Sequence, residues 1–181
     1  MEIDIKIPWS SDKNLGAAYN RLMQDVRGWV CFMDHDVLQL NPNWYYMCLN
    51  AIKQVGTGAG WITGMTNLIA CRRQYKPDAP KNHNILKHIR YARKEYERYG
   101  DMLCAMPEKI PLAFSGCMIL THRWAWEKVG GFPDGFTRVD NEYYRRLEHH
   151  GYERYVMPGL YMYHVYNGKH EWNKRGWFGG L

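Results

Sequence analysis

The sequence predicts an α/β protein in which helices flank a single, parallel-type sheet. Short apolar strands alternate with segments of helical spacing, and the first four elements follow the order strand, helix, strand, helix. An apolar strand over 28–33 runs directly into Asp34 and Asp36, and acidic residues there are typical of ligand sites in open α/β sheets. A chain of 181 residues is long enough for one domain with a real core, so 1–181 is expected to be a single domain.

Local patterns in the first part of the chain predict two strands and two helices. The segment 3–7 alternates isoleucine with charged residues and stops at a proline, as a half-buried strand does. Apolar residues at helical spacing predict a helix over 15–23, and the apolar run 28–33 predicts a buried strand. The Asn-Pro pair 41–42 predicts the cap and first position of a helix that continues through 44–55.

A basic insert, 71–100, follows the next predicted strand, 60–65. Within the insert, 84–99 is predicted to form an amphipathic helix with one apolar face and one basic face. The basic face is either an ordinary solvated surface or a specific anion site. The apolar face consists of Ile85, Ile89, Ala92, Tyr96 and Tyr99, and the basic face of Lys87, Arg90, Lys94 and Arg98.

The last part of the chain predicts a strand over 115–120, in which a glycine indicates that something approaches the backbone closely. Thr121 is expected to cap a helix over 124–129, which the next two glycines end. A further helix is predicted over 141–150, and a final strand over 156–164.

Composition narrows the class of protein. No apolar run approaches the length of a membrane span, and the charged start has no signal-peptide character, so a cytoplasmic protein is expected. Five widely separated cysteines without a C-x-x-C pair predict reduced thiols rather than a zinc site or disulfides. A net charge of +6 favours anionic partners such as nucleotide diphosphates, nucleic acid or acidic glycans.

Asp34 and Asp36 are the first candidates for chemistry. Two carboxylates one residue apart at the end of an apolar strand can hold a divalent cation against a diphosphate. The alternative is a polar turn that only closes the strand.

Further motifs follow in a defined order. The helix at 14–20 has the pattern N-x-G-x-x-x-N and is followed by D-x-D at 34–36. Ser115-Gly116 precedes a Val-Gly-Gly-Phe turn at 129–132, and 136–152 approximates F-x-x-E-D-x-D-L-x-x-R-L-x-x-x-G-Y. This ordered set, which covers most of the chain, resembles the family 2-like glycosyltransferases of the GT-A fold.

The resemblance implies a GT-A, Rossmann-like sheet that is shortened at its N-terminus, and metal-dependent, inverting sugar transfer. The donor would be a nucleotide diphosphate sugar, a UDP-sugar, and the cofactor Mn²⁺ or Mg²⁺, which neutralises the leaving diphosphate. Asp36 matches the direct metal ligand, and Asp34 matches the carboxylate that contacts the ribose and helps to hold the metal. His164 matches the late histidine of the metal site, with His170 as the second choice, although a histidine in an aromatic strand can be purely structural.

Asp140 matches the family's catalytic base, which takes the proton from the acceptor hydroxyl. It could equally be a helix N-cap, and Val139 stands where many relatives carry Glu. The residues that match the binding site for the donor and acceptor sugars are Ser115, Gly116, Gly131, Phe132, Asn141 and Glu142.

Nucleotide recognition is expected in the short segment before and within the first helix. Trp9 could stack on the base, Asp12 could accept from the base or ribose, and Lys13 could contact phosphate. An ordinary polar turn is the alternative. The full candidate set is Pro8, Trp9, Asp12, Lys13, Asn14, Gly16, Asn20 and Asp34.

The acceptor is expected to be a hydroxyl on a saccharide, a protein or, because of the basic insert, a hydroxylated DNA base. The tail, 165–181, resembles a mobile lid over the donor, or else a frayed end. Two other functions remain open. One is a non-catalytic nucleic-acid-binding module that uses the basic helix and exposed aromatic residues. The other is a metal-dependent phosphohydrolase, since paired aspartates also serve that chemistry.

Overall fold

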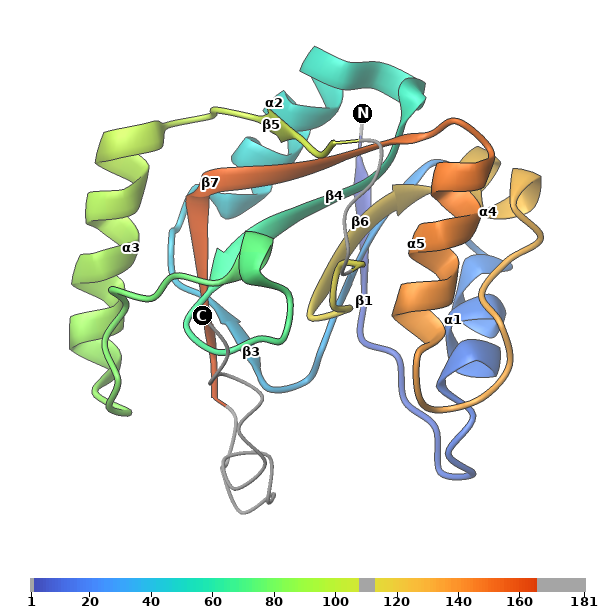
Figure 1. The fold of residues 1–181 in the computed structure, drawn as a ribbon, viewed down its shortest axis with the longest axis horizontal. Coiled ribbons are helices and arrows are strands. Elements are labelled where there is room, and N and C mark those ends of the chain that lie inside the picture. Colours follow the sequence, from blue (N-terminus) through green and yellow to red (C-terminus); the bar gives the residue numbers. More distant parts are fainter. Residues whose placement is uncertain (1, 108–112, 166–181) are drawn as a thin grey trace.

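The computed structural model describes residues 2–107 and 113–165, which form one open sheet flanked by helices (Figure 1). The strands are β1 (Ile3–Lys6), β2 (Trp29–Met33), β3 (Val37–Gln39), β4 (Ala59–Thr66), β5 (Cys104–Ala105), β6 (Met118–His122) and β7 (Glu153–His164). The helices are α1 (Leu15–Met23), α2 (Trp44–Val55), α3 (Ile85–Tyr99), α4 (Arg123–Lys128) and α5 (Val139–His149), with short 3₁₀ helices η1 (Gly56–Gly58) and η2 (Arg72–Gln74).

The sheet is mixed, although the α/β class was predicted correctly. Within the described residues its seven strands follow the order β1-β2-β6-β4-β7-β3, and β5 pairs with β7. β1 is parallel to β2, and β4 is parallel to β7. Because β2 and β4 both pair antiparallel with β6, the four strands β1, β2, β4 and β7 run in one direction. Their carboxyl ends therefore lie at the same end of the sheet, the end at which β6 begins. The arrangement is compatible with a Rossmann-like fold.

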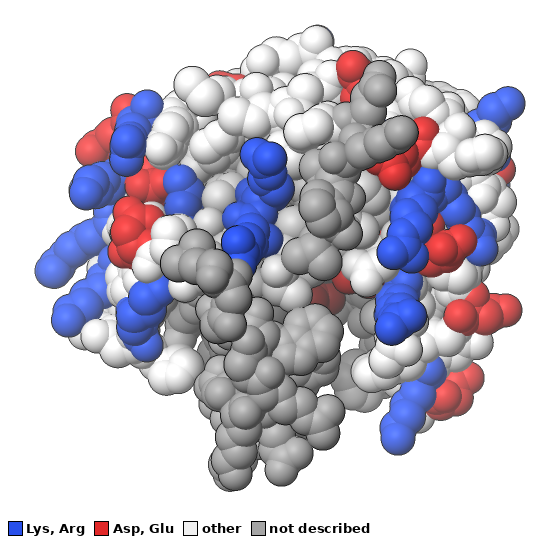
Figure 2. All heavy atoms as spheres, in the orientation of Figure 1, with Lys and Arg blue, Asp and Glu red and all other residues white. Residues whose placement is uncertain are grey.

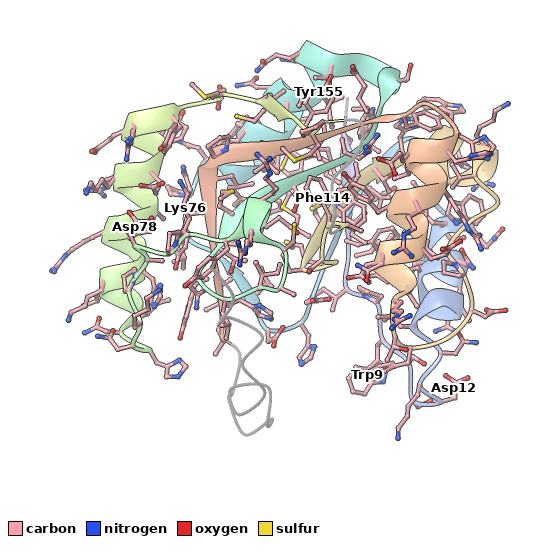
Figure 3. The ribbon with its side chains drawn as sticks, in the orientation of Figure 1. Trp9, Asp12, Lys76, Asp78, Phe114 and Tyr155 are labelled. Carbon is pink, nitrogen blue, oxygen red and sulfur yellow. The ribbon has the colours of Figure 1, made fainter. Side chains whose placement is uncertain are left out.

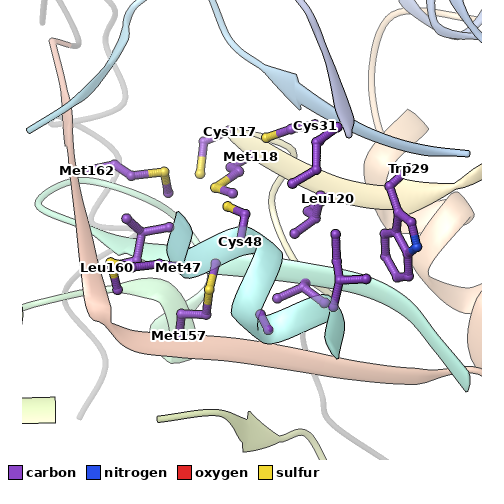
Figure 4. Packing of buried hydrophobic residues seen from close by; sticks show 14 of the residues in the cluster. Trp29, Cys31, Met47, Cys48, Cys117, Met118, Leu120, Met157, Leu160 and Met162 are labelled. Carbon is purple, nitrogen blue, oxygen red and sulfur yellow. The ribbon is translucent and has the colours of Figure 1, made fainter. Parts of the chain in front are cut away.

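Alternation along the central strands divides the core into two layers. In β2, Trp29 and Cys31 face α2, whereas Val30 and Phe32 face α1, α4 and α5. The layer under α2 is rich in sulfur, since methionines and cysteines from α2, β6 and β7 meet there (Figure 4). All five cysteines are free thiols, as predicted.

The positions of α1 and α2 were predicted correctly, but two of the predicted caps are wrong. Pro42 lies before α2, because the Asn41 side chain accepts the N–H of Asn43 at 2.9 Å and forms a separate turn there. Thr121 does not cap α4. Its hydroxyl donates to the Gly60 carbonyl at 2.7 Å, and the ring of His122 caps the helix instead.

The buried face of α3 differs from the predicted apolar face. Ile89 is 37% exposed, whereas His88 and Glu95 are buried. Both polar groups have partners: the Tyr161 hydroxyl lies 2.7 Å from Nδ1 of His88, and Glu95 forms a buried ion pair with Lys76, which lies beside α3 (Figure 3). The residues of α3 that are buried are His88, Tyr91, Ala92 and Glu95.

Strand boundaries were less predictable than helix positions. β3 and β5, of three and two residues, were missed because each depends on pairing with β7 far away in sequence. β6 begins at Met118 rather than 115, and β7 begins at Glu153 rather than 156. No helix within the described ranges is long and apolar enough to span a membrane. His170 and the predicted lid, beyond Val165, lie outside the described residues.

Candidate active site

Asp34, Asp36 and His164 meet at the carboxyl end of the sheet, and we call these three residues the acidic corner. Each offers a ligand atom, and these atoms lie within 4.8 Å of one another. Asp34 and Asp36 lie in the turn between β2 and β3, and His164 ends β7, the strand that pairs with β3. The turn is tied to β7 by the N–H of Val165, which donates to the carbonyl of Asp36 at 2.8 Å.

The contacts of His164 leave its Nε2 atom facing the carboxylates. Nδ1 lies 2.8 Å from the carbonyl oxygen of Leu68, and since a carbonyl only accepts, Nδ1 carries the proton. Nε2 lies on the other side of the ring, 3.4 Å from Oδ1 of Asp36. A backbone carbonyl that orients the ring in this way is typical of histidine ligands to metals.

Asn67 and Leu68 support this histidine and were not predicted. The N–H of His164 donates to Oδ1 of Asn67 at 2.8 Å, and Nδ2 of Asn67 donates to the carbonyl of His164 at 3.2 Å. Both supporting residues follow the carboxyl end of β4 directly. The rule that singled out Asp34, polar residues after a strand, would have found Asn67, but not Leu68, which contributes only its backbone carbonyl.

Burial, together with the neighbouring carboxylates, opposes ionisation of Asp34. Burial is the main cause that raises its pKa to about 6, and the neighbouring carboxylates of Asp36 and Asp140 raise it further, whereas His164 lowers it. A divalent cation would relieve this repulsion. Carboxylate oxygens with one imidazole nitrogen form a donor set that suits Mn²⁺, and the oxygens suit Mg²⁺.

Asp140 lies in the first turn of α5 and is held from both sides. The N–H of Gly116 donates to Oδ2 at 2.8 Å, and the N–H of Asn141 donates to Oδ1 at 2.8 Å. Burial raises the pKa of Asp140, and these hydrogen bonds lower it. The N-cap interpretation is wrong, because Arg138, with a left-handed φ of 64°, occupies that position.

Gly116 and Tyr19 shape the surroundings of Asp140. A Cβ atom on Gly116 would lie 3.2 Å from the Cβ of Asp140, so the predicted close approach to a glycine is confirmed. Tyr19, which was not predicted as a site residue, stacks on Phe132 with ring centroids 4.4 Å apart. Its pKa is raised by burial first and then by the charges of Asp34 and Asp140, so the phenol lies close to both carboxylates.

The predicted nucleotide-binding residues of α1 join a turn, 130–135, and we call Asn14, Gly16, Asn20 and this turn the latch. Oδ1 of Asn14 accepts the N–H groups of Ala17 at 3.0 Å and of Gly135 at 2.9 Å. Asn20 makes a matched pair of 2.9 Å bonds to the N–H and carbonyl of Phe132. Both amides thus serve the fold, and a nucleotide-binding role for them stays a prediction.

The latch also contains two of the predicted sugar-site residues, Gly131 and Phe132. Gly131 has a φ of 76°, and its carbonyl accepts from Nη1 of Arg146 at 3.1 Å. Nε of Arg146 lies 3.3 Å from Oε1 of Glu142, so this predicted acid forms an ion pair within α5. Asp140, by contrast, directs its carboxylate at the N–H of Gly116.

Ser115 and Asn141 hold the backbone beside Asp140. The side chain of Gln74 donates to the carbonyl of Ser115 at 3.0 Å and accepts its N–H at 2.8 Å. Nδ2 of Asn141 donates to the carbonyl of Phe114 at 3.3 Å. Gln74 is fully buried and was not predicted, because a glutamine between two arginines and a tyrosine carries no motif.

The loop from Pro8 to Asn14 follows the carboxyl end of β1, so it lies at the same end of the sheet as the acidic corner. Trp9 is 69% exposed, and its ring lies 6.4 Å from that of His35, so it stands beside the D-x-D turn (Figure 3). Asp12 accepts from the Ser10 hydroxyl at 2.5 Å, which lowers its pKa. Lys13 is exposed and has a left-handed φ of 57°.

Comparison with models of known protein families finds no match to this chain, and comparison with curated protein sequences finds none either.

Proposed function

We propose that this protein is a metal-dependent, inverting glycosyltransferase of the GT-A type that uses a nucleotide diphosphate sugar, a UDP-sugar. One observation carries the proposal: two aspartates and an oriented histidine gather at the carboxyl ends of the strands, beside a third, half-buried aspartate on α5. Titratable groups with perturbed pKa values that cluster at the end of a sheet are typical of active sites.

Asp36 and Nε2 of His164 are the proposed metal ligands, and Asp34 the carboxylate shared between the metal and the donor ribose. When bound, Mn²⁺ or Mg²⁺ supplies positive charge that stabilises the diphosphate leaving group. Trp9 offers an exposed ring beside the turn for stacking on the base.

Asp140 is the proposed base that takes the proton from the acceptor hydroxyl. Its two backbone hydrogen bonds fix the orientation of the carboxylate. Burial raises its pKa, which makes the carboxylate a stronger base. The acceptor is proposed to be a hydroxyl on a saccharide, a protein or a modified DNA base.

Thermal unfolding with a panel of nucleotides, with and without Mn²⁺, tests this proposal. A UDP-sugar with Mn²⁺ is expected to raise the melting temperature, because a ligand that binds only the folded state stabilises it. The Asp36→Asn variant should lose the metal-dependent part of this shift. The matched control is Asp25→Asn, which removes an exposed carboxylate after α1.

If no nucleoside diphosphate raises the melting temperature of the wild type with Mn²⁺, the donor proposal is wrong. If the nucleotide shift is the same in Asp36→Asn and in the wild type, the assignment of the metal ligands is wrong.

Nucleic-acid binding without catalysis is the second candidate, and the exposed basic residues of α3 favour it. Lys and Arg side chains cover α3, with acidic side chains among them (Figure 2). On this alternative, Asp34→Asn with Asp36→Asn would preserve or tighten DNA binding, since the variant removes negative charge. A gel-shift titration at two salt concentrations measures this, and DNA binding absent from the wild type excludes it.

A further inference from the structure

β1 forms an open edge of the sheet. Among the described strands it pairs only with β2, at one end of the strand order. The N–H of Ile3 donates to the hydroxyl of Tyr45 at 3.0 Å rather than to β2, so it points to the open edge. Because every second residue of a strand points its N–H and C=O to the same side, those of Ile5 also face this edge. Continuing the extended chain past the end of β1 at Lys6 would place those of Ile7 there too.

The side chains of this strand are only partly covered. Ile5 is 40% exposed and Ile7 is 54% exposed, on the face that Ile3 shares. Asp4 and Lys6, on the other face, are half-buried. Neither charged side chain makes a hydrogen bond or ion pair with another residue in the described ranges. An edge with open backbone groups and exposed aliphatic side chains favours pairing with another strand.

The order of residues in β1 is self-complementary when the strand meets its own copy. Antiparallel pairing about a twofold axis at Ile5 sets Ile5 against Ile5 and Ile3 against Ile7. It also sets Asp4 against Lys6 twice, once on each side of the axis. An axis at Asp4 or at Lys6 would oppose like charges at the centre, which destabilises cross-strand pairs.

We propose that a second copy of this chain pairs with β1 in this register and forms a dimer with one continuous sheet. At the hydrogen-bonding positions, Ile5 offers both its N–H and its carbonyl, whereas the N–H of Ile3 would exchange the Tyr45 hydroxyl for the carbonyl of Ile7. Pro8, which has no N–H, falls opposite Glu2 at a non-hydrogen-bonding position. The exposed faces of Ile5 and Ile7 become buried against their counterparts. The inference does not depend on the proposed catalytic function.

Charge-swap variants measured by sedimentation equilibrium test the pairing. The wild type is expected to dimerise, and Asp4→Lys or Lys6→Asp should each weaken the dimer at least about tenfold, because each opposes like charges twice. The double variant, Asp4→Lys with Lys6→Asp, restores opposite charges and should dimerise like the wild type. An equimolar mixture of the two single variants should form a heterodimer, since lysines then face aspartates.

Circular dichroism of each variant provides the folding control, and both side chains are partly solvated, so the fold should tolerate these changes. A wild type that stays monomeric at about 100 μM, a concentration that populates even weak dimers, overturns the proposal. A dimer that both single variants retain at wild-type strength, or single variants that do not associate with each other, also overturns it, because the contact then lies elsewhere.

Discussion

The latch and the acidic corner are both built from polar motif residues, but they treat their polar groups in opposite ways. In the latch, the amide of Asn20 satisfies Phe132 from both sides, and Gly16 admits the backbone of the turn. In the acidic corner, the pKa of Asp34 rises, mainly because the carboxyl is buried and further because Asp36 and Asp140 lie near it.

This difference separates polar motif residues that stabilise the fold from polar motif residues that are free to act in a functional site. Mutually satisfied hydrogen bonds stabilise the fold, whereas clustered carboxylates raise the free energy of the folded protein at neutral pH. Such a cost is typical of sites that bind a cation or transfer a proton. The two regions should therefore respond differently to substitution: the latch in stability, and the corner in activity.

Asp140→Asn is expected to have the largest effect. It should lower the transfer rate by about 1000-fold, the usual contribution of a general base, and leave the melting temperature within a few degrees of the wild type. Glycoside formation from a UDP-sugar in single-turnover assays measures the rate. Retention of more than a tenth of the wild-type rate would contradict the role of Asp140 as the base.

Gly16→Ala should act on the latch alone. An added Cβ would lie 1.7 Å from the carbonyl oxygen of Pro133, so the turn must move, and we expect a loss of about 3 kcal/mol in the free energy of unfolding. Urea unfolding measures it. Gly28→Ala is the control, since nothing lies within 4 Å of its added Cβ. Equal stability of the two variants would show that the latch is not rigid.

Asp34→Asn should stabilise the metal-free protein by about 3 kcal/mol at pH 7.5. The pKa of Asp34 is raised from its ordinary 3.8 to about 6, so the folded state holds the proton more tightly than the unfolded state. Wild-type stability therefore falls as pH rises from about 4 to about 6 and then levels off. Urea unfolding with a chelator at pH 3.5 and 7.5 checks this: the gain should vanish at the lower pH.

Glu142→Gln should have the smallest effect, under about 0.5 kcal/mol in unfolding free energy, because its ion pair with Arg146 is solvent-exposed. The Michaelis constant for the acceptor is measured alongside stability, and a change in it would show that Glu142 contributes to acceptor binding and not only to the ion pair within α5. An unchanged constant would remove it from the predicted sugar site.

Local patterns predicted the fold well where one segment decides its own structure. The helix spacing of α1 and the apolar run of β2 are properties of a few neighbouring residues, and both match the structure. The direction of β6 depends on which strands it joins, and so the parallel-type sheet was only partly right. The buried face of α3 was missed because His88 and Glu95 find partners on distant segments.

The candidate site could be predicted in part for a related reason. Asp34, Asp36 and His164 end or follow strands, and strands that run in the same direction bring their ends together. The motif at 14–20 was interpreted as nucleotide-binding, and that role stays a prediction; the bonds that its amides make within the latch were not predicted. Gln74 carries no sequence signal, because its importance arises only when Ser115 lies beside it.

The position of His164 at the end of β7 has a consequence for biosynthesis. The aspartates of the corner emerge early from the ribosome, but the imidazole and the β4 residues that orient it come together only when β7 docks beside β3 and β4. A nascent or truncated chain therefore cannot assemble the three ligands. Cation affinity should thus distinguish chains in which β7 has docked from chains that lack it.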